Sequence, residues 1–259
     1  MAITLGDMKT GGAPKAPRIV VYGPPGIGKT WLGADAPNPV FLQTESGLGE
    51  READTPHFPL VKDVLSVNEI LDALLGEHDR QTLVIDTADW LDHMIADAVY
   101  ASHSPQELGY GKDQVIISEW WRKLLEKMNA LRERGMATLF LAHSQIKSMN
   151  APDSAGYDRY VPKLSKAGTA ALQEWADAVL FAHQPVAIIQ EEGGFNRKRT
   201  RGIGAETVLC TRPNAAYIAK NRYNLPEQIP FGAGQPNAWD VINAGVAGKF
   251  RRDAGNEPI

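Results

Sequence analysis

The sequence predicts an α/β protein whose mostly parallel central sheet is flanked by helices. Short β-branched runs alternate with segments in which apolar residues recur every three or four positions, as in a parallel sheet covered on both faces. The chain has 259 residues and is 43% hydrophobic, which is enough for one substantial core. We therefore expect one main domain at 18–247, between flexible segments at 1–17 and 248–259.

The first part of the domain combines expected strands and helices. The expected strands are 18–22, 40–43, 82–86 and 137–142. The expected helices are 67–75, 88–100, 115–134 and 169–176. The stretch from Ile146 to Lys166 is rich in Ser, Asp, Gly, Pro and Lys and lacks an apolar period, so it predicts a mobile loop of functional length.

The remaining chain predicts an antiparallel extension of the sheet near the C-terminus. Further strands are expected at 178–182, 186–190, 207–210 and 216–218. Two of them, 186–190 and 207–210, flank a glycine-containing turn region at 191–204 that holds the densest basic run of the chain. That run is Arg197, Lys198, Arg199 and Arg201. It is either a solvated hairpin tip or a contact for a phosphate or an acidic partner.

Composition limits the other possibilities. The formal net charge of -4 means that any contact with nucleic acid would depend on a local basic patch. The single cysteine, Cys210, excludes an internal disulfide, and its strand-like surroundings predict a small buried apolar side chain. No window approaches the roughly 18 apolar residues of a membrane span, and the N-terminus lacks a secretory signal. We expect a cytoplasmic protein without membrane contacts.

The clearest chemical motif is a glycine-rich loop between an expected strand and an expected helix, Gly23-x4-Gly28-Lys29-Thr30. Its glycines allow backbone N–H groups to surround phosphates, and the following helix adds its positive end. Lys29 would contact the β- and γ-phosphates of ATP, and Thr30 would place its hydroxyl on Mg²⁺. The expected nucleotide-binding residues are Gly23, Pro24, Pro25, Gly26, Ile27, Gly28, Lys29, Thr30 and Trp31.

Two carboxylates are candidates for the chemistry of hydrolysis. Asp86 ends the expected strand 82–86 and would support the metal, with Asp89 as a weaker candidate for a share of this role. The alternative for Asp86 is a cap on the following helix. Glu45 follows the strand 40–43 and would orient or deprotonate the attacking water; a solvated loop carboxylate is its alternative.

Three polar residues follow the expected strand 137–142. His143, Ser144 and Gln145 stand where a γ-phosphate could be sensed, next to the expected mobile loop. Such a position would couple the nucleotide state to that loop. An ordinary strand cap is the alternative.

Over about residues 18–225 the chain resembles the RecA-like P-loop NTPase core, and most closely the small phage-encoded RecA-like ATPases of the Sak group, which are single-strand-annealing recombination proteins. The resemblance rests on four segments, Gly23 to Thr30, Gln43 to Gly47, Val84 to Thr87 and Leu141 to Gln145. It implies an ATPase with Glu45 as the catalytic glutamate, and the cytoplasm of a bacterial host as its location.

A fifth segment, Ala219 to Tyr223, resembles the Lys-x-Arg finger of RecA-like and hexameric-helicase ATPases. The resemblance implies that Lys220 and Arg222 are catalytic residues that act on the nucleotide of a neighbouring subunit, in a ring or a filament. Cations stabilise charge on a transferred phosphoryl group, so a finger supplied in trans would make turnover depend on assembly. Surface cations that are merely solvated are the alternative.

The same resemblance implies two loops that contact DNA, at about 102–113 and 146–166. Their candidate DNA-binding residues are Lys112, Lys147, Tyr157, Arg159, Tyr160, Lys163 and Lys166. Cations follow phosphates and tyrosines stack on bases, although Asp153 and Asp158 weaken the positive charge of the second loop. A surface loop without a ligand is the alternative.

Taken with the resemblance, the sequence predicts an ATP-dependent single-stranded DNA-binding protein that promotes or regulates strand annealing as a homo-oligomer. Hydrolysis is expected to be stimulated by oligomerisation and DNA, and a single-stranded-DNA-binding or replication protein is a candidate partner. One alternative is a helicase-like or helicase-loading ATPase, and another is an ATP-driven assembly switch that does not bind DNA. A small-molecule kinase is disfavoured because no arginine-rich lid is visible in the sequence.

Overall fold

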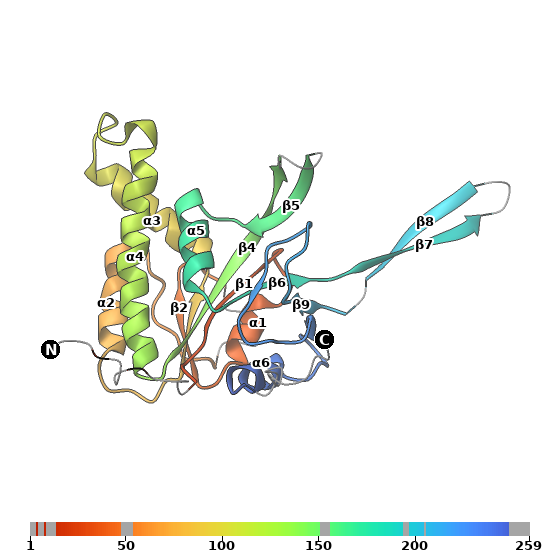
Figure 1. The fold of residues 1–259 in the computed structure, drawn as a ribbon, viewed down its shortest axis with the longest axis horizontal. Coiled ribbons are helices and arrows are strands. Elements are labelled where there is room, and N and C mark those ends of the chain that lie inside the picture. Colours follow the sequence, from red (N-terminus) through yellow and green to blue (C-terminus); the bar gives the residue numbers. More distant parts are fainter. Residues whose placement is uncertain are drawn as a thin grey trace.

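A central sheet between two layers of helices forms the body of the protein (Figure 1). The computed structural model describes residues 14–47, 54–150, 156–193, 197–204 and 206–248, together with Thr4 and Met8. The parallel strands are β1 (Arg18–Gly23), β2 (Pro39–Gln43), β3 (Thr82–Asp86), β4 (Ala137–Met149) and β6 (Ala178–His183). They lie in the order β6-β1-β4-β3-β2. The predicted α/β fold with a mostly parallel sheet is confirmed.

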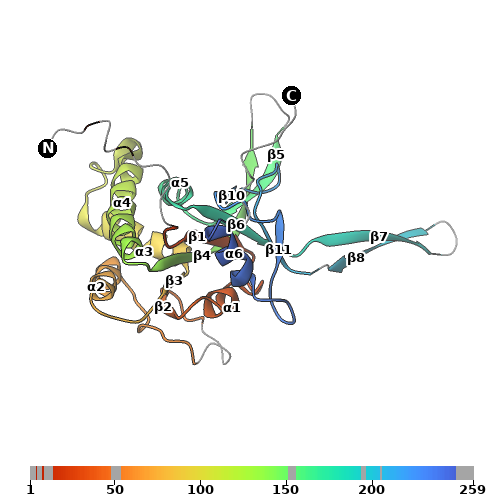
Figure 2. The same cartoon turned by 60° about the horizontal axis from the view of Figure 1, so that its bottom comes forward.

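Helices cover both faces of this sheet (Figures 1 and 2). One layer contains α2 (Val64–Leu74), α3 (Ala88–Ser102), α4 (Lys112–Glu133) and α5 (Lys166–Trp175), and the other contains α1 (Lys29–Ala34) and α6 (Ala238–Val246). Alternate residues of β1 serve the two layers: Val20 and Tyr22 pack on the first side, and Ile19 and Val21 on the second. This double burial explains why the strands are continuous apolar runs.

The four helices expected from apolar spacing are present, and each begins at or before its predicted start. The polar residues just before the apolar period act as caps. The Asp63 side chain accepts a hydrogen bond from Ser66 N at the start of α2. Ser165 accepts one from Gly168 N at the start of α5. Such caps satisfy backbone N–H groups of the first turn, so helices extend to them.

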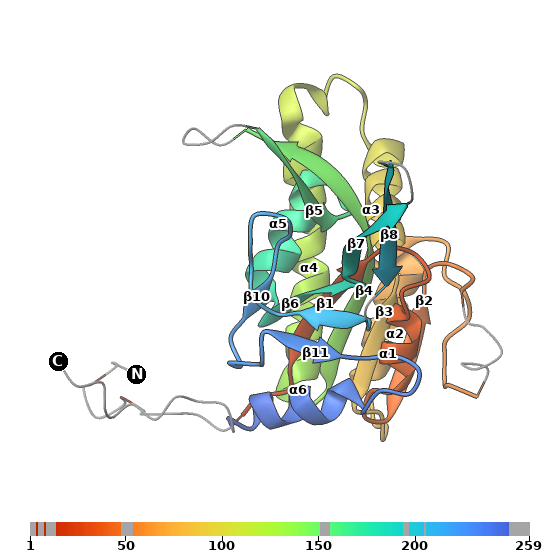
Figure 3. The same cartoon turned by 90° about the vertical axis from the view of Figure 1, so that its right-hand side faces the viewer.

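The stretch 146–166, which was expected to be a loop, is largely a β-hairpin. Strand β4 continues past the sheet to Met149 and pairs antiparallel with β5 (Tyr157–Pro162). The register places polar residues opposite each other, for example Ser148 and Asp158. Residues Ile146 to Met149 are exposed, and the ribbon shows no regular apolar alternation from which strands could be predicted. The hairpin and α6 lie at opposite ends of the molecule (Figures 1 and 3).

The predicted antiparallel extension is present but differs in composition. Strand β9 (Val208–Cys210) pairs antiparallel with β6, and β11 (Gln228–Pro230) pairs with β9. The strand expected at 186–190 is present within β7 (Val186–Gly193), but its expected place in the central sheet was wrong: β7 pairs with β8 (Arg197–Gly204) in a separate two-stranded sheet that projects from the body (Figures 1 and 2). Most of the expected turn region is therefore strand. The side chains of its basic run lie outside the described part of the structure.

Smaller differences complete the comparison. The expected strand 216–218 is a single bridge between Tyr160 and Tyr217, and it precedes the short β10 (Lys220–Asn221). Cys210 is buried on β9, as predicted, and burial raises the pKa of its thiol. The segments 1–17 and 248–259, expected to be flexible, lie mostly outside the described residues. Among the helices that are described, none is both long and apolar enough to cross a membrane.

Candidate nucleotide-binding site

The sheet brings the predicted site residues together at the carboxyl ends of its parallel strands. Gly23 pairs with His143 between β1 and β4, and Gln43 pairs with Asp86 between β2 and β3. Strand β4 lies between β1 and β3, so His143 stands between Gly23 and Asp86 along this edge. Ligands of open α/β sheets bind outside the carboxyl ends of the strands. The residues that follow these strands are therefore in position to form one site.

The loop between β1 and α1 depends on two of its glycines. A Cβ atom at Gly23 would lie 2.6 Å from the carbonyl oxygen of Ala182 on β6, so only glycine permits this close strand approach. Gly28 has φ of 98°, a conformation that side chains with a Cβ rarely adopt. Of the expected nucleotide-binding residues, Gly26 to Trp31 line a cavity, and Gly23 to Pro25 are not part of its lining.

Lys29 is held at the centre of this loop. Its Nζ donates hydrogen bonds to the carbonyl oxygens of Gly23 (3.1 Å) and Pro24 (2.9 Å). Burial lowers the pKa of Lys29, while the carboxylates of Asp86, Asp89 and Glu45 oppose that shift. The ammonium group is thus positioned against the loop backbone, where a bound phosphate chain would meet it.

Thr30 and Asp86 meet across the cavity floor. The Thr30 hydroxyl donates a 2.9 Å hydrogen bond to Asp86 Oδ2. Asp86 is 6% exposed, and burial raises its pKa to about 6. The cap of the following helix is Thr87, so the capping alternative for Asp86 does not hold. The two oxygens are the hard ligands that Mg²⁺ prefers, so the residues present fit this metal.

The described residues contain no cluster of three or more His, Cys, Asp or Glu side chains that could hold a metal ion by themselves. Mg²⁺ ions in nucleotide sites do not require such a cluster. Such ions take one or two protein oxygens and complete their octahedral shell with phosphate oxygens and water. Thr30 and Asp86, whose side-chain oxygens are hydrogen-bonded to each other, would be the protein ligands of such an ion.

Thr44 fixes the position of Glu45 beside Asp86. Thr44 N donates to the carbonyl oxygen of Asp86 at 2.8 Å. Thr44 Oγ1 donates to the carbonyl oxygen of Thr87 (2.8 Å) and accepts from Thr87 N (2.6 Å). These bonds extend the contact between β2 and β3 beyond the strands themselves. Glu45 consequently lines the cavity next to Asp86, where a group that orients water would be required.

The cavity has a volume of about 760 Å³, a size that suits a small-molecule ligand. Its opposite wall comes from residues that the sequence did not single out: Gln184, Glu206, Thr207, Phe231, Gly232, Ala233 and Gln235. Phe231 is buried, and its ring edge lies 3.6 Å from where a Cβ of Gly28 would be. Gly232 and Gly234 after Phe231 are a local sequence signal for a turn at this wall. The rest of the wall could not be predicted, because it joins segments far apart in the chain.

The three residues expected to sense the γ-phosphate separate in the structure. His143 lines the nucleotide cavity, and both its ring Nδ1 and its backbone N contact Asp89. Ser144 and Gln145 line a second cavity beside α3, which His143 also borders. Asp89, the weaker candidate for metal support, is engaged with His143. Of these residues, His143 is the one that lines the cavity with the phosphate loop.

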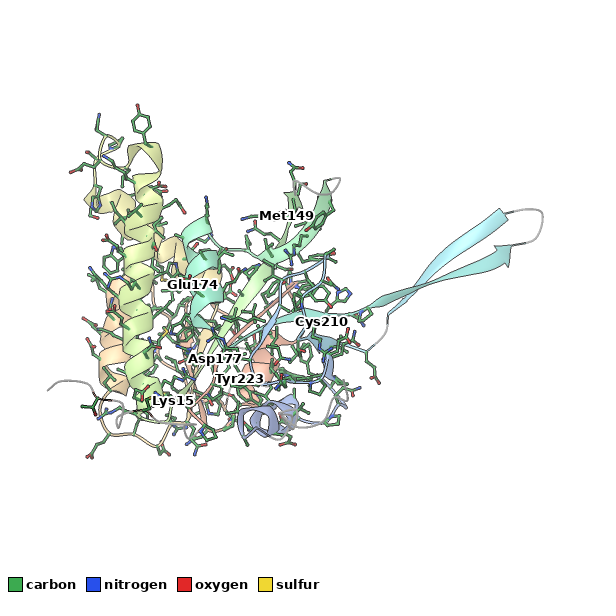
Figure 4. The ribbon with its side chains drawn as sticks, in the orientation of Figure 1. Lys15, Met149, Glu174, Asp177, Cys210 and Tyr223 are labelled. Atoms are coloured by element: carbon green, nitrogen blue, oxygen red, sulfur yellow. The ribbon has the colours of Figure 1, made fainter. Side chains whose placement is uncertain are left out.

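The expected finger lies at the opposite edge of the sheet. Strand β10 pairs with the beginning of β6, whereas the nucleotide cavity lies beyond the strand ends. Lys220 Nζ donates to the carbonyl oxygens of Gln173 (2.7 Å) and Glu174 (3.0 Å) at the end of α5. The Arg222 side chain is 56% exposed and contacts Asp177. Figure 4 shows Asp177 next to Tyr223. Neither cation faces the cavity of its own protomer.

The candidate DNA-binding residues divide into two groups. Arg159 Nη2 donates to the carbonyl oxygens of Asn214 and Tyr217, and the ring of Tyr160 stacks on Phe181. These contacts are within the protein. Lys112, Lys147, Lys163 and Lys166 are exposed, and Tyr157 is half-buried. The exposed lysines are the better candidates for contact with a phosphate backbone.

Comparison with known proteins places the chain in a family. The AAA domain family matches residues 15–223, which is more than three quarters of the chain. A search of the curated proteins finds no match. The finer resemblance to the Sak group stays a prediction. Together with the phosphate loop, Asp86 and the sheet order described above, the match shows that this chain belongs to the AAA domain family of P-loop ATPases.

Proposed function

We propose that the protein hydrolyses ATP in this cavity and uses its nucleotide state to regulate binding of single-stranded DNA during strand annealing or recombination. The observation that supports it best is the convergence of Lys29, Thr30, Glu45 and Asp86 on one cavity. A cationic, a hydroxyl and two carboxylate groups at one site are what phosphoryl transfer to water requires.

The residues divide the work of hydrolysis. The loop amides and Lys29 hold the phosphate chain and offset its charge. Thr30 and Asp86 hold Mg²⁺, which when bound would neutralise charge on the β- and γ-phosphates. Glu45 orients a water molecule for in-line attack and accepts its proton. The buried position of Lys29 and Asp86 limits competing hydration and strengthens these interactions.

We extend the proposal to a homo-oligomer in which Arg222 acts on the nucleotide of a neighbour. Arg222 lies near the start of β6, whereas the nucleotide cavity of the same protomer lies beyond the end of that strand. A strand of this length separates the two by about 17–20 Å. Arg222→Ala should therefore reduce turnover of the assembled protein while nucleotide affinity is retained. Mixing it with Lys29→Ala should restore part of the turnover if the finger acts in trans. Absence of such rescue would favour a purely structural Arg222.

The DNA part of the proposal is supported by the position of the β4–β5 hairpin. This hairpin begins at His143, a wall of the nucleotide cavity, and carries the exposed Lys147. The starts of α4 and α5 are joined by a hydrogen bond from Ala167 N to Gln114 Oε1 (3.3 Å), which places the exposed Lys112 and Lys166 in one region. Exposed cations of this kind can follow a phosphate backbone.

The proposal is tested by binding of a labelled oligonucleotide with and without ATP, over a range of salt concentrations. We expect affinity to fall as salt rises, and to change when ATP is added. A Lys147→Glu variant should bind more weakly, with Lys62→Glu as an exposed control distant from the hairpin in the sequence. Annealing without directional unwinding supports the proposed role, and unwinding supports the helicase-like alternative. Absence of DNA binding would support the second alternative, an ATP-driven assembly switch that does not bind DNA.

A further inference from the structure

The hairpin formed by β7 and β8, called the arm from here on, projects away from the body of the protein (Figures 1 and 2). Within the described sheets its two strands pair with each other, and neither joins the central sheet. An isolated two-stranded hairpin is marginally stable at best in water. Such an element gains stability when a partner binds along it, so the arm is a candidate interaction surface.

The arm is basic, although the chain as a whole is acidic. Residues 186–204 contain two carboxylates, Glu191 and Glu192, and four cations. The cations are Arg197, Lys198, Arg199 and Arg201. Four positive and two negative charges give this stretch a formal net charge of +2, whereas the whole chain has -4. The charge of the arm therefore favours an anionic partner.

The pairing register divides these charges unequally between the two faces of the arm. Alternate positions of a strand share a face, and so do directly paired positions of neighbouring strands. Three arginines occupy alternate positions of β8, and together they are called the arginine row: Arg197, Arg199 and Arg201. Among their three partners on β7, only Glu191 is charged. On the opposite face Lys198 is paired with Glu192, so the charges there cancel.

The spacing of the arginine row fits a phosphate backbone. Alternate residues of a strand are about 6.6 Å apart, because each residue advances the strand by about 3.3 Å. This is close to the distance between successive phosphates of an extended nucleic-acid strand. A guanidinium group also binds phosphate oxygens through two parallel hydrogen bonds. An extended single strand can follow such a row, whereas the phosphates of a duplex curve away around its axis, and the carboxylates of an acidic protein have no such regular spacing.

The arm leaves the body beside the nucleotide cavity. Strand β6 ends at His183, which pairs with Val208 of β9, and the arm is inserted in the chain between these two residues. Gln184 precedes the arm, Glu206 and Thr207 follow it, and all three line the cavity. Both ends of the arm therefore border the site whose nucleotide state the proposed function links to DNA binding.

We infer that the arginine row binds the phosphate backbone of single-stranded nucleic acid, with one phosphate at each of its three positions. The inference rests on the proposed function, because the DNA of that function is the strand that the arm would hold. It adds a contact surface separate from the β4–β5 hairpin, since the arm and that hairpin point in different directions (Figure 2). Phosphate contacts carry no sequence information, so the arm should bind strands of any sequence.

The experiment compares the wild type with a triple variant, Arg197→Gln, Arg199→Gln and Arg201→Gln. Binding of a labelled oligo-dT strand is measured by fluorescence anisotropy over a range of salt concentrations, with a non-hydrolysable ATP analogue present. Loss of three phosphate contacts should lower the affinity by roughly tenfold or more. The slope of log affinity against log salt should fall in magnitude by about 2, at about 0.7 per phosphate contact on a single strand. Affinity for the ATP analogue should match that of the wild type.

Two single variants provide a matched control, because they remove the same charge from neighbouring positions on opposite faces of the arm. Arg199→Gln should lower the magnitude of the salt slope by about 0.7, and Arg199→Lys should largely restore it. Lys198→Gln should leave the slope at the wild-type value. Equal changes in Arg199→Gln and Lys198→Gln would overturn the inference, because binding would then depend on total charge and not on the arginine row. If the triple variant does not fold, this pair decides.

The outcomes also separate the inference from the proposed function. A wild-type protein that binds no oligonucleotide would remove the DNA part of the proposed function, and the inference with it. Wild-type affinity and salt slope in the triple variant, together with weak binding by Lys147→Glu, would place the contact on the β4–β5 hairpin and overturn the inference alone. Tighter binding of a duplex than of the single strand by the arginine row would also overturn it.

Discussion

Two buried aspartates lie at opposite edges of the same sheet and have opposite electrostatic surroundings. Asp86, at the carboxyl edge, meets the Thr30 hydroxyl, and burial raises its pKa to about 6. Asp177, at the amino edge, is paired with Arg18 (2.9 Å) and Arg132 (2.9 Å). Burial alone would raise its pKa as well, but these arginines hold the pKa of Asp177 below its ordinary value.

The difference between the surroundings of Asp86 and Asp177 suggests that the carboxyl edge binds a ligand and that the amino edge stabilises the fold. At the amino edge, Tyr223 and Arg222 also contact Asp177, so its negative charge is compensated within the protein (Figure 4). At the carboxyl edge, the described residues form no salt bridge with the Asp86 carboxylate, which instead accepts a hydrogen bond from the Thr30 hydroxyl. Groups with pKa values raised by burial in a cavity are typical of functional sites. A bound metal would supply the balance that arginines supply at the other edge.

The largest effect is expected at the carboxyl edge. Lys29→Ala should lower ATP hydrolysis by about a thousandfold or more, because it removes the cation that offsets charge on the transferred phosphoryl group. Phosphate release measures this directly, with the exposed Lys62→Ala as the control. Turnover at the wild-type rate in Lys29→Ala would contradict the site assignment.

The largest effect on folding is expected at the amino edge. Asp177→Ala should lower the free energy of unfolding by about 3–4 kcal/mol, since it leaves Arg18 and Arg132 without their buried partner. Urea denaturation provides the value. Glu126→Ala removes an exposed ion pair with Arg122 and should cost less than about 1 kcal/mol. If Asp177→Ala also cost less than about 1 kcal/mol of unfolding free energy, the Asp177 cluster would not stabilise the fold.

Asp86→Asn should raise the free energy of unfolding, whereas Asp177→Ala should lower it. In protein free of magnesium, the buried Asp86 binds protons more readily when folded than when unfolded, so its contribution to stability falls as pH rises from about 4 to about 6. The variant should thus be more stable than the wild type at pH 7, by up to about 3 kcal/mol. The gain should shrink toward pH 4. Urea denaturation across this range checks it, and a gain that grows toward acid pH would contradict the interpretation.

The smallest effect on folding is expected for Arg222→Ala. This side chain is 56% exposed, and Asp177 keeps Arg18 and Arg132 as partners without it. The free energy of unfolding should change by less than about 1 kcal/mol. Thermal or urea denaturation gives the answer. A loss as large as that of Asp177→Ala would make Arg222 part of the fold and would argue against its availability to a neighbouring subunit.

Much of the carboxyl edge could be predicted from the sequence. The segment from Gly23 to Thr30, Glu45, Asp86 and His143 each follow a continuous apolar strand, and parallel strands bring their carboxyl ends to one edge. The spacing of the glycines reflects local backbone geometry, which a sequence carries directly. Local signals therefore identified the phosphate side of the cavity.

The remaining features depend on contacts between distant segments. Phe231 and its neighbours reach the cavity only because β11 joins the sheet beside β9. The pairing of Asp89 with His143 also spans a long stretch of chain. The β4–β5 hairpin was missed because its residues show no regular apolar alternation, and those from Ile146 to Met149 are exposed. Lys220 has the spacing of a finger, yet its hydrogen bonds are to backbone carbonyls at the end of α5.

The central claim is that the cavity at the carboxyl edge binds the triphosphate of ATP. Its most direct test is an experimental structure of the protein with Mg²⁺ and a non-hydrolysable ATP analogue. We predict phosphate density against the backbone of Gly26 to Thr30, with the metal beside Thr30 and Asp86 and the γ-phosphate facing Glu45. A nucleotide bound elsewhere on the protein, with this cavity empty, would contradict the account.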